Sequence, residues 1–346
     1  MKIAQLVSNY YPTAVNSPHG IYYHVGWLTK TLLERGVDVT LFASGDSETK
    51  GSLFSIAEKA SRNMDISEDM RRQYLHLLIS YCYQNSSRYD LIHAHFNLTS
   101  SYYSSIVDTP TLQSIHSPID PTTKEMMRHF KNNRYVSFSL AQRREMPELN
   151  WVANIYHGVN TQEFAFNPDP QDYLLYLGRI TKDKGVHLAI EAARATNTPL
   201  VIAGRSYPED PYWHETIQKQ IDGKLIRFVG EADFKTKIEY LQNAKALLMP
   251  VQWQEPFGLV MIEAMSCGTP VIGWNNGSIP EVVQDRETGY VVNHMDYMVK
   301  AINTLDKISR QACRDRAQRF FSMEKMVAGY EHVYARIIEE HRNSKK

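Results

Sequence analysis

Short apolar runs alternate with longer amphipathic stretches along most of this chain of 346 residues. In the first half, the apolar runs predict strands at residues 2–7, 37–44, 91–95, 111–116, 135–140 and 151–155. Amphipathic stretches predict helices at residues 22–34 and 70–85. Two adjacent parallel strands cannot be joined by a tight turn and need a longer crossover, which is usually a helix. Strands that alternate with helices are therefore typical of a parallel sheet. The alternation therefore predicts βαβ units around a parallel sheet.

The same alternation begins again after residues 159–172, a segment with Pro168 and Pro170 that we interpret as a linker. Strands are predicted at 173–177, 200–203, 226–229, 246–249, 270–274 and 289–292, and helices at 186–196, 212–222, 235–243 and 259–266. We expect two doubly wound α/β domains, residues 1–160 and 161–321, with a helix at about 322–346 that packs back onto the first. Ligands of such sheets bind at the carboxyl ends of the strands, so the expected site is a cleft between the domains.

Composition excludes several classes of protein. Lys and Arg number 38, as do Asp and Glu, so the formal net charge of zero argues against a dedicated nucleic-acid-binding protein. The three cysteines, Cys82, Cys267 and Cys313, fit neither a zinc site nor a disulfide framework. The first apolar stretch is too short for a signal peptide, and no run approaches the ~18 apolar residues that span a bilayer. We expect a cytoplasmic protein, at most peripheral at the inner face of the membrane.

The most informative segment is E-P-F-G-L-V-M-I-E-A-M-S-C-G-T-P-V-I, residues 255–272. Pro256 and Gly258 open a predicted helix, so the backbone N–H groups of Phe257, Gly258 and Leu259 are expected to be free to hold an anionic group.

Two carboxylates, Glu255 and Glu263, flank that helix start, eight residues apart. A helix of that length spans at most ~12 Å, which is about the reach from a hexose across a diphosphate to a ribose. An isolated pair at this spacing is more often a loop charge and a solvated helix residue. Here the apolar neighbours of Glu263 predict a buried helix, in which a charge needs a partner or a ligand.

A cluster of positive charge follows the strand predicted at 173–177. The sequence G-R-I-T-K-D-K-G, residues 178–185, places Arg179 and Lys184 on the loop at the carboxyl end of that strand. A guanidinium fork and an ammonium are suited to a diphosphate leaving group. A solvated basic loop is the alternative, but the loop shares its topological position with the segment that contains Glu255.

Together these motifs resemble those of retaining glycosyltransferases of family 4, which have the GT-B fold. The resemblance includes G-R-I-T-K-D-K-G, the E-x7-E pair, S-C-G-T-P-V-I (266–272), G-S-I-P-E-V-V (277–283) and T-G-Y-V-V (288–292). The first half is similar more weakly, through the loop with Tyr11, Pro12 and Gly20, S-I-H-S with His116, and H-G-V-N-T-Q-E-F (157–164). Two positions depart from the family pattern: His19 stands where a second glycine is common, and the usual N-G-V/I-D element is H-G-V-N.

The resemblance implies two Rossmann-like doubly wound domains that face each other across a deep cleft, the first for the acceptor and the second for the donor. It implies transfer of a hexosyl unit from a nucleotide sugar to an acceptor hydroxyl with retention, in glycan, glycolipid or glycoconjugate biosynthesis. A UDP-sugar is favoured as donor, and GDP-mannose is the alternative. The acceptor is a sugar, a lipid-linked molecule or a small molecule.

The resemblance also assigns roles to residues. It implies that Arg179 and Lys184 bind the diphosphate, that Glu263 binds the ribose, and that Glu255 binds the transferred sugar. His116 would contact the primary hydroxyl of the sugar or the reacting centre. The catalytic set is then Glu255, His116, Arg179 and Lys184. The donor-binding set comprises Gly20, Arg179, Lys184, Gly204, Arg205, Val229, Glu255, Phe257, Gly258, Leu259 and Glu263.

Neither a cofactor nor a metal is expected. The chain has no Asp-x-Asp motif of the kind that holds Mn²⁺ in transferases of the other major fold. His93 and His95 lie on one face of a predicted strand, but no carboxylate or cysteine stands at a matching spacing. Packing or acceptor-side hydrogen bonding is the favoured interpretation of this pair.

Further partners and competing functions remain open. Residues 124–134 mix basic with apolar side chains and are a candidate for peripheral membrane contact, with a solvated amphipathic helix as the alternative. A Rossmann dehydrogenase would need G-x-G-x-x-G after a strand, which is absent. A GT-B epimerase or phosphorylase, or a non-catalytic protein that binds sugars or nucleotide sugars, remains as an alternative to the transferase.

Overall fold

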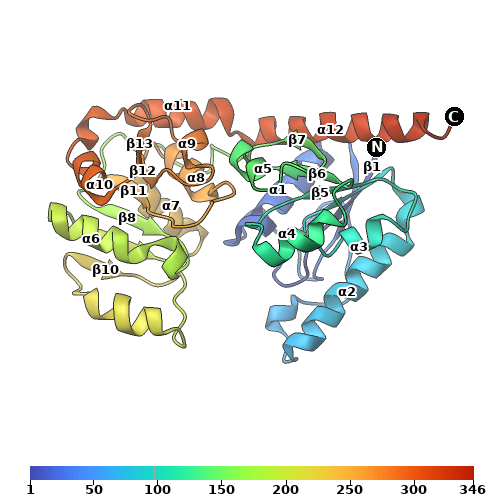
Figure 1. The fold of residues 1–346 in the computed structure, drawn as a ribbon, viewed down its shortest axis with the longest axis horizontal. Helices are drawn as coiled ribbons and strands as arrows, with labels where there is room; N and C mark the ends of the chain where they lie inside the picture. The colour runs from blue at the N-terminus through green and yellow to red at the C-terminus, as the bar shows by residue number, and fades with distance from the viewer. Residues whose placement is uncertain (97) are drawn as a thin grey trace. The chain divides into compact units, whose positions relative to one another are not determined.

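The computed structural model describes residues 1–96 and 98–346. These residues form two compact units. The first consists of Met1–His157 together with Met323–Lys346, and the second of Gly158–Ser322. Figure 1 labels many of the helices and strands of both units.

A parallel sheet of seven strands, in the order β3-β2-β1-β4-β5-β6-β7, forms the centre of the first unit. The strands are β1 (Lys2–Leu6), β2 (Asp38–Phe42), β3 (Ser52–Phe54), β4 (Leu91–Ala94), β5 (Thr111–Ser114), β6 (Arg134–Ser137) and β7 (Trp151–Asn154). The chain begins inside the sheet, proceeds outward to β3, and then returns to the other side of β1 with β4. The direction of winding therefore reverses between β1 and β4, and ligands of such sheets usually bind at the carboxyl ends of the strands where the winding reverses.

Helices cover this sheet because strands that are apolar on both sides must be shielded on both faces. They are α1 (Gly20–Glu34), α2 (Glu68–Gln84), α3 (Ser101–Ser104), α4 (Pro121–Arg128), α5 (Leu140–Glu145) and α12 (Met323–Asn343). The last of these, α12, comes from the far end of the sequence and packs against α1 and β4 (Figure 1). Its buried residues recur at helical spacing, as in Met326, Tyr330, Tyr334 and Ile337.

Two tyrosines of α12 form hydrogen bonds beneath the sheet of the first unit. The hydroxyl of Tyr334 accepts a bond of 3.0 Å from Nε2 of Gln5 and lies 2.6 Å from Nδ1 of His93. The hydroxyl of Tyr330 lies 2.9 Å from Oγ of Ser114. All of these side chains are fully buried, so the bonds satisfy polar groups that have no access to water.

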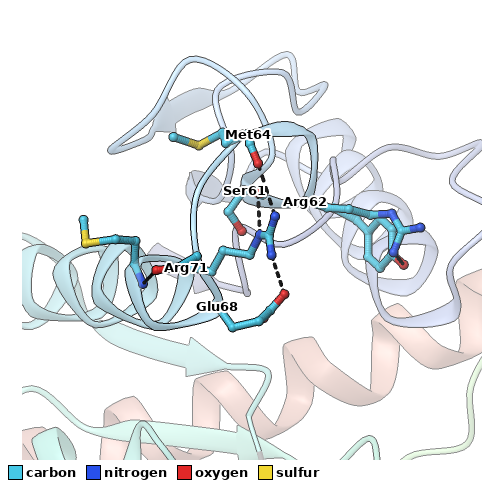
Figure 2. A network of polar contacts seen from close by, with 8 residues as sticks. Ser61, Arg62, Met64, Glu68 and Arg71 are labelled. Atoms are coloured by element: carbon cyan, nitrogen blue, oxygen red, sulfur yellow. Dashed lines mark hydrogen bonds and ion pairs between the residues drawn. The ribbon is translucent and has the colours of Figure 1, made fainter.

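The segment between β3 and α2 is fastened by an arginine. Arg71 donates from Nε to the carbonyl of Ser61 at 3.0 Å and from Nη2 to the carbonyl of Met64 at 3.2 Å, and it forms an ion pair with Glu68 (Figure 2). The neighbouring Arg62 donates to the hydroxyl of Tyr11 at 2.9 Å. These contacts hold the loop that follows β1 against the rest of the first unit.

The second unit repeats the plan with six parallel strands in the order β10-β9-β8-β11-β12-β13. The strands are β8 (Leu174–Leu177), β9 (Leu200–Ala203), β10 (Ile226–Phe228), β11 (Ala246–Met249), β12 (Val271–Trp274) and β13 (Gly289–Val292). The helices are α6 (Val186–Thr196), α7 (Phe234–Asn243), α8 (Leu259–Ser266), α9 (Ile279–Val282), α10 (Met295–Ile302) and α11 (Arg310–Phe320). The winding reverses between β8 and β11, which are direct neighbours.

Four expectations from the sequence are corrected by the structure. The strand Ser52–Phe54 was not predicted, because three residues carry too little periodicity to detect. Residues 212–222 form a π-helix at Tyr212–Ile217 and a 3₁₀ turn at Gln218–Gln220 instead of one α-helix. The strand predicted at 135–140 ends at Ser137, because Ser139 caps α5 by accepting a bond from the amide of Gln142.

The fourth correction concerns residues 124–134, the candidate for membrane contact. The helix α4 ends at Arg128, and Arg134 already belongs to β6, so no single helix spans this segment. Lys124 pairs with Glu145 at 2.7 Å and Arg128 with Glu148 at 3.2 Å. The carboxylates therefore offset part of the positive charge on which a membrane contact would depend. Separately, no helix within residues 1–96 and 98–346 has the length and apolar content that crossing a bilayer requires.

We expect Tyr334→Phe to lower the free energy of unfolding by about 1–3 kcal/mol, because it leaves buried groups of Gln5 and His93 without a partner. Tyr297→Phe is the matched control, since Tyr297 is 59% exposed and should change stability by less than about 0.5 kcal/mol. Urea denaturation of both variants measures the difference. Equal stability of the two variants would contradict the role given to the Tyr334 hydroxyl.

Candidate active site

The candidate site of the second unit lies where its sheet reverses direction. Because β8 and β11 are neighbours and parallel, the loops that follow them leave the same edge of the sheet side by side. The loop after β8 carries Arg179 and Lys184, and the loop after β11 carries Glu255. The structure thus brings together the two clusters that sequence patterns singled out separately.

Lys184 and Glu255 form a close ion pair in these loops. Nζ of Lys184 lies 2.7 Å from Oε2 of Glu255, and the indole Nε1 of Trp253 donates to the same oxygen at 2.8 Å. Glu255 is only 8% exposed. A carboxylate removed from water in this way is stabilised by the two donors, and the bond from the ammonium is of the stronger, charge-assisted kind.

Trp253 is a member of this cluster that sequence reasoning missed. Nζ of Lys184 lies 4.1 Å from the centroid of the Trp253 ring, and the guanidinium of Arg179 lies 5.7 Å from it. Both cations therefore face the same indole, within the range of cation–π attraction. The sequence could have indicated Trp253, because it is an aromatic residue two positions before Glu255 in a loop at the carboxyl end of a predicted strand.

Two glycines allow these loops to approach each other. Gly185 has a φ of +75°, and a Cβ atom there would lie 2.0 Å from the carbonyl oxygen of Pro250. Gly277 has a φ of +57°, and its Cβ would lie 2.3 Å from the backbone nitrogen of Glu255. Any other residue at either position would push the loops apart, so both glycines help to place the Lys184–Glu255 pair.

Among the described residues, no hydrogen bond is seen from the backbone amides of Gly258 and Leu259 at the start of α8. Gly258 is the N-cap residue with a φ of +76°, and no side chain caps the helix. The first amides of a helix have no acceptor within the helix, and they lie at the positive end of the helix dipole. Both properties favour an anion at this position. By contrast, the side chain of Phe257 is 2% exposed and packs against Phe321, so only its backbone is suited to a ligand.

Glu263 has a protein partner that was not predicted. The carboxylate is 5% exposed, and its Oε1 lies 2.7 Å from Nζ of Lys237 on α7. The expectation that a buried charge needs a partner or a ligand is thus met by Lys237. Burial of Glu263 therefore no longer argues by itself for a ribose contact. A lysine within the amphipathic pattern of residues 235–243 was the available signal.

Three further residues expected to bind the donor follow β9 and β10, at the carboxyl edge of the same sheet. Gly204 and Arg205 directly follow β9, and the carbonyl of Arg205 accepts a bond of 2.9 Å from the amide of Ile180. Val229 follows β10, and its amide donates to the carbonyl of Ile202 at 3.0 Å. All three therefore belong to the same edge of the sheet as Arg179.

In the first unit, His116 lies two residues after β5, at the edge where the sheet reverses. Its Nε2 lies 2.9 Å from Nδ1 of His95, and Nε2 of His95 lies 2.8 Å from Oε1 of Gln5. The amide oxygen of Gln5 can only accept, so Nε2 of His95 donates and Nδ1 of His95 accepts from His116. Gly20, the other residue predicted from this unit, is the exposed first residue of α1.

More imidazoles surround His116 than the sequence suggested. His24 of α1 and His157 lie next to it, with ring centroids 5.1 and 5.6 Å from that of His116. Burial lowers the pKa of His24 to about 3 and holds the pKa values of His95 and His116 well below the usual range. These rings are therefore neutral at neutral pH. The sequence could have indicated His24 in one way, because it lies on the buried face of the helix predicted at 22–34.

Comparison with known proteins locates the most similar part of the chain. Residues 160–320, nearly the whole second unit, match the family model described as glycosyl transferases group 1. An uncharacterized 41.2 kDa protein of the cps region of Klebsiella pneumoniae is 33% identical over 46% of this chain and 45% of its own length. The glycogen synthase of Mycobacterium tuberculosis is 35% identical over 41% of this chain and 36% of its own length. The chain thus spans less than half the length of these curated relatives.

Similarity in fold extends over both units. The crystal structure of HepE from Anabaena, in complex with UDP and glucose, superposes with a TM-score of 0.74 and 18% identity. The superposition covers 97% of this chain and 99% of that one. The fold class predicted from the sequence, two Rossmann-like doubly wound domains of the GT-B type, is confirmed.

We expect Lys237→Met to lower the free energy of unfolding by about 3–5 kcal/mol, because it leaves Glu263 charged and buried without its cation. Lys235→Met on the exposed side of the same helix is the matched control and should change stability by less than about 0.5 kcal/mol. The double variant Lys237→Met with Glu263→Gln should recover much of the loss. Denaturant titration of the three variants decides, and a loss for Lys237→Met no larger than the control's would contradict the pairing.

Proposed function

We propose that the protein is a retaining glycosyltransferase of family 4 that moves a hexosyl unit from a nucleotide sugar, a UDP-sugar in the first place, to an acceptor hydroxyl. The observation that carries the proposal is the Lys184–Glu255 pair beside Arg179 and the free amides of α8, all at the reversal point of the second sheet. Cations and helix amides suit a diphosphate, and a buried carboxylate suits sugar hydroxyls.

The comparisons support this proposal at a coarser level. The family model of glycosyl transferases group 1 covers residues 160–320, which contain every donor-site residue proposed here except Gly20 and His116. The preference for a UDP-sugar is supported by HepE, which was crystallised with UDP and glucose. GDP-mannose remains the alternative donor.

Lys184 can serve Glu255 and a diphosphate at the same time. Its ammonium has three N–H donors, and the bond to Oε2 of Glu255 uses one of them. The remaining donors and the fork of the exposed Arg179 are available to phosphate oxygens. Stabilising the negative charge that develops on the leaving diphosphate is the contribution that we assign to these two cations.

The reaction breaks the bond between the anomeric carbon and the diphosphate oxygen and forms one to the acceptor oxygen on the same face. In the proposed mechanism, the leaving diphosphate takes the acceptor proton, and the protein supplies orientation and charge. Glu255 binds the hydroxyls of the transferred sugar, near the positive charge at the anomeric carbon. Glu263 binds the ribose, and His116 contacts the sugar.

The donor is tested by thermal unfolding with UDP-glucose, UDP-N-acetylglucosamine and GDP-mannose, together with an assay of slow donor hydrolysis. A donor at 100 times its Kd adds about 2.7 kcal/mol of stability, so a UDP-sugar should raise the melting temperature and be hydrolysed. Lys184→Ala should remove both effects. Stabilisation by GDP-mannose alone would overturn the choice of nucleotide, whereas binding with neither hydrolysis nor transfer would favour a non-catalytic sugar-binding protein.

The carboxylates Glu255 and Glu263 should separate in kinetics. Glu263→Gln should weaken binding of free UDP by about 10- to 100-fold, because a charged hydrogen-bond acceptor for the ribose is lost. Glu255→Gln keeps an acceptor for Lys184, so it should spare binding of UDP and lower kcat by about 10²–10³-fold. Glu239→Gln, at an exposed position of α7, is the control.

Calorimetric Kd values for UDP and kcat values for the three variants provide the measurement. The result that would contradict the assignment is a Glu255→Gln variant that loses UDP affinity as strongly as Glu263→Gln while kcat is intact.

A further inference from the structure

We propose that His24, His95 and His116 of the first unit form a binding site for one divalent transition-metal ion, with Zn²⁺ as the preferred ion. The three imidazoles come from three separate elements: α1, the end of β4 and the loop after β5. One ring nitrogen from each lies within 4.8 Å of the others. This proposal concerns binding by the first unit and does not depend on the transferase assignment.

The centroids of the three rings form a triangle close in size to that of three imidazoles around a tetrahedral ion. Their centroids are 5.6 Å apart for His24 and His95, 5.1 Å for His24 and His116, and 5.2 Å for His95 and His116. Zinc–nitrogen bonds of about 2.0–2.1 Å at tetrahedral angles place ring nitrogens roughly 3.3 Å apart and ring centres roughly 5 Å apart. The ring centres thus have nearly this spacing, whereas nitrogens of different rings, which are up to 4.8 Å apart, must approach one another by rotation of the side chains.

A buried nitrogen of His24 supports the proposed site. The ring is fully buried, and its Nδ1 lies 2.8 Å from Nδ1 of His157. Within the described part of the chain, its Nε2 is buried and has no hydrogen-bond partner. A buried polar atom without a partner is costly, and a metal ion on Nε2 would satisfy it.

The hydrogen bonds of His95 and His116 determine which of their ring nitrogens carry a proton and which can bind a metal ion. Because Nε2 of His95 donates to Gln5, its Nδ1 carries a lone pair. In the metal-free form that lone pair accepts the Nε2 proton of His116. On binding, the proton on Nε2 of His116 transfers through solvent to Nδ1 of the same ring, and Nε2 becomes a ligand. The ligands are thus Nε2 of His24, Nδ1 of His95 and Nε2 of His116.

The surroundings resemble the outer shell of a histidine metal site. Ligand histidines usually donate their second N–H to a carbonyl or a similar acceptor, which fixes the tautomer. Gln5 accepts from His95, and Gln5 is in turn held by its bond to Tyr334. In the proposed metal-bound form, Nδ1 of His157, 2.8 Å from Nδ1 of His24, is the acceptor for Nδ1–H of His24. His116 is only partly buried, which leaves a side for entry of the ion and for a fourth ligand.

The chemistry of the donors selects the class of ion. Imidazoles favour Zn²⁺ and neighbouring transition metals, whereas Mg²⁺ and Ca²⁺ require oxygen ligands. No Asp or Glu occurs among the buried residues that the structure describes in the first unit. His93 is not a ligand, because its two nitrogens lie 2.6 Å from Tyr334 and 2.8 Å from Ser114. The pair His93 and His95, which the sequence did not support as a metal site, is thus replaced by a different trio.

The site also has a consequence for the proposed transferase. Nε2 of His116 cannot bind an ion and contact a sugar at the same time. If His116 has the sugar contact proposed above, Zn²⁺ should therefore inhibit transfer. This consequence rests on the proposed function, whereas the binding measurement below does not.

The test uses the full chain, freed of metal with a chelator, and titrates it with ZnCl₂ by calorimetry and with CoCl₂ by visible absorption. We expect one ion per chain and the intense visible bands of tetrahedral Co²⁺. His116→Gln and His24→Phe should each weaken binding at least about 10-fold, and Gln5→Leu by about 10- to 100-fold. His129→Gln, at an exposed histidine of the same unit, is the matched control and should bind as the parent does.

The partly exposed position of His116 makes His116→Gln the safest variant, and its melting curve checks that it is folded. Absence of binding by Zn²⁺ and Co²⁺ to the folded parent protein would overturn the proposal. Equal affinity of His116→Gln and His129→Gln would overturn it as well, because the ion would then lie at surface groups. Zn²⁺ binding without inhibition of transfer would leave the metal site intact and remove His116 from the sugar contact.

Discussion

Parallel pairing of buried strands is the constraint on which the rest of this structure depends. Adjacent parallel strands need a crossover, and helices such as α1 and α6 supply it while shielding the apolar faces of the sheet. Both sheets begin at an inner strand, wind outward, and then resume on the other side of that strand. The loops at the carboxyl ends of β1 and β4, and of β8 and β11, consequently leave the same edge of their sheet side by side. Polar groups from separate loops are thereby brought together in each unit.

The two reversal points hold opposite kinds of chemistry. In the second unit, formal charges are held by partners: Lys184 faces Glu255 and Lys237 faces Glu263, each at 2.7 Å. Loss of one residue of either pair would leave the charge of the other uncompensated and buried. Each lysine is therefore expected to stay close to its glutamate when an anionic ligand binds. In the first unit the groups are imidazoles, amides and hydroxyls, and burial lowers the histidine pKa values so that the rings stay neutral. These groups are the basis of the two proposals, a diphosphate site in the second unit and a site for a transition-metal ion in the first.

The helix α12 contributes both to the stability of the first unit and to the hydrogen bonding of its buried histidines. Although α12 is the end of the sequence, Tyr334 bonds to Gln5 and lies beside His93, which are 329 and 241 positions away in the chain. Gln5 in turn determines which nitrogen of His95 carries the proton. A hydroxyl on the final helix thus bears on the state of imidazoles at the reversal point of the first sheet. Such a network is effective because buried polar groups must find partners inside the protein.

The sequence by itself determined the α/β class, the positions of nearly all strands along the chain, and the charged groups in the loops that follow β8 and β11. Those features are local: periodicity specifies strands and helices, and glycines such as Gly185 and Gly258 mark where loops meet a helix start. The sequence placed Arg179, Lys184 and Glu255 in loops at carboxyl ends of strands, and the adjacency of β8 and β11 brings these loops together.

Only the tertiary structure decided which partners the buried groups have. The bond of Trp253 to Glu255, the pairing of Lys237 with Glu263, and the meeting of His24 with His95 and His116 depend on which side chains face each other across packed elements. No local pattern carries that information, since the free energy of these contacts comes from burial and from exclusion of water, which exist only once the elements have packed. The π-helix at Tyr212–Ile217 escaped prediction because its periodicity is close to that of an α-helix.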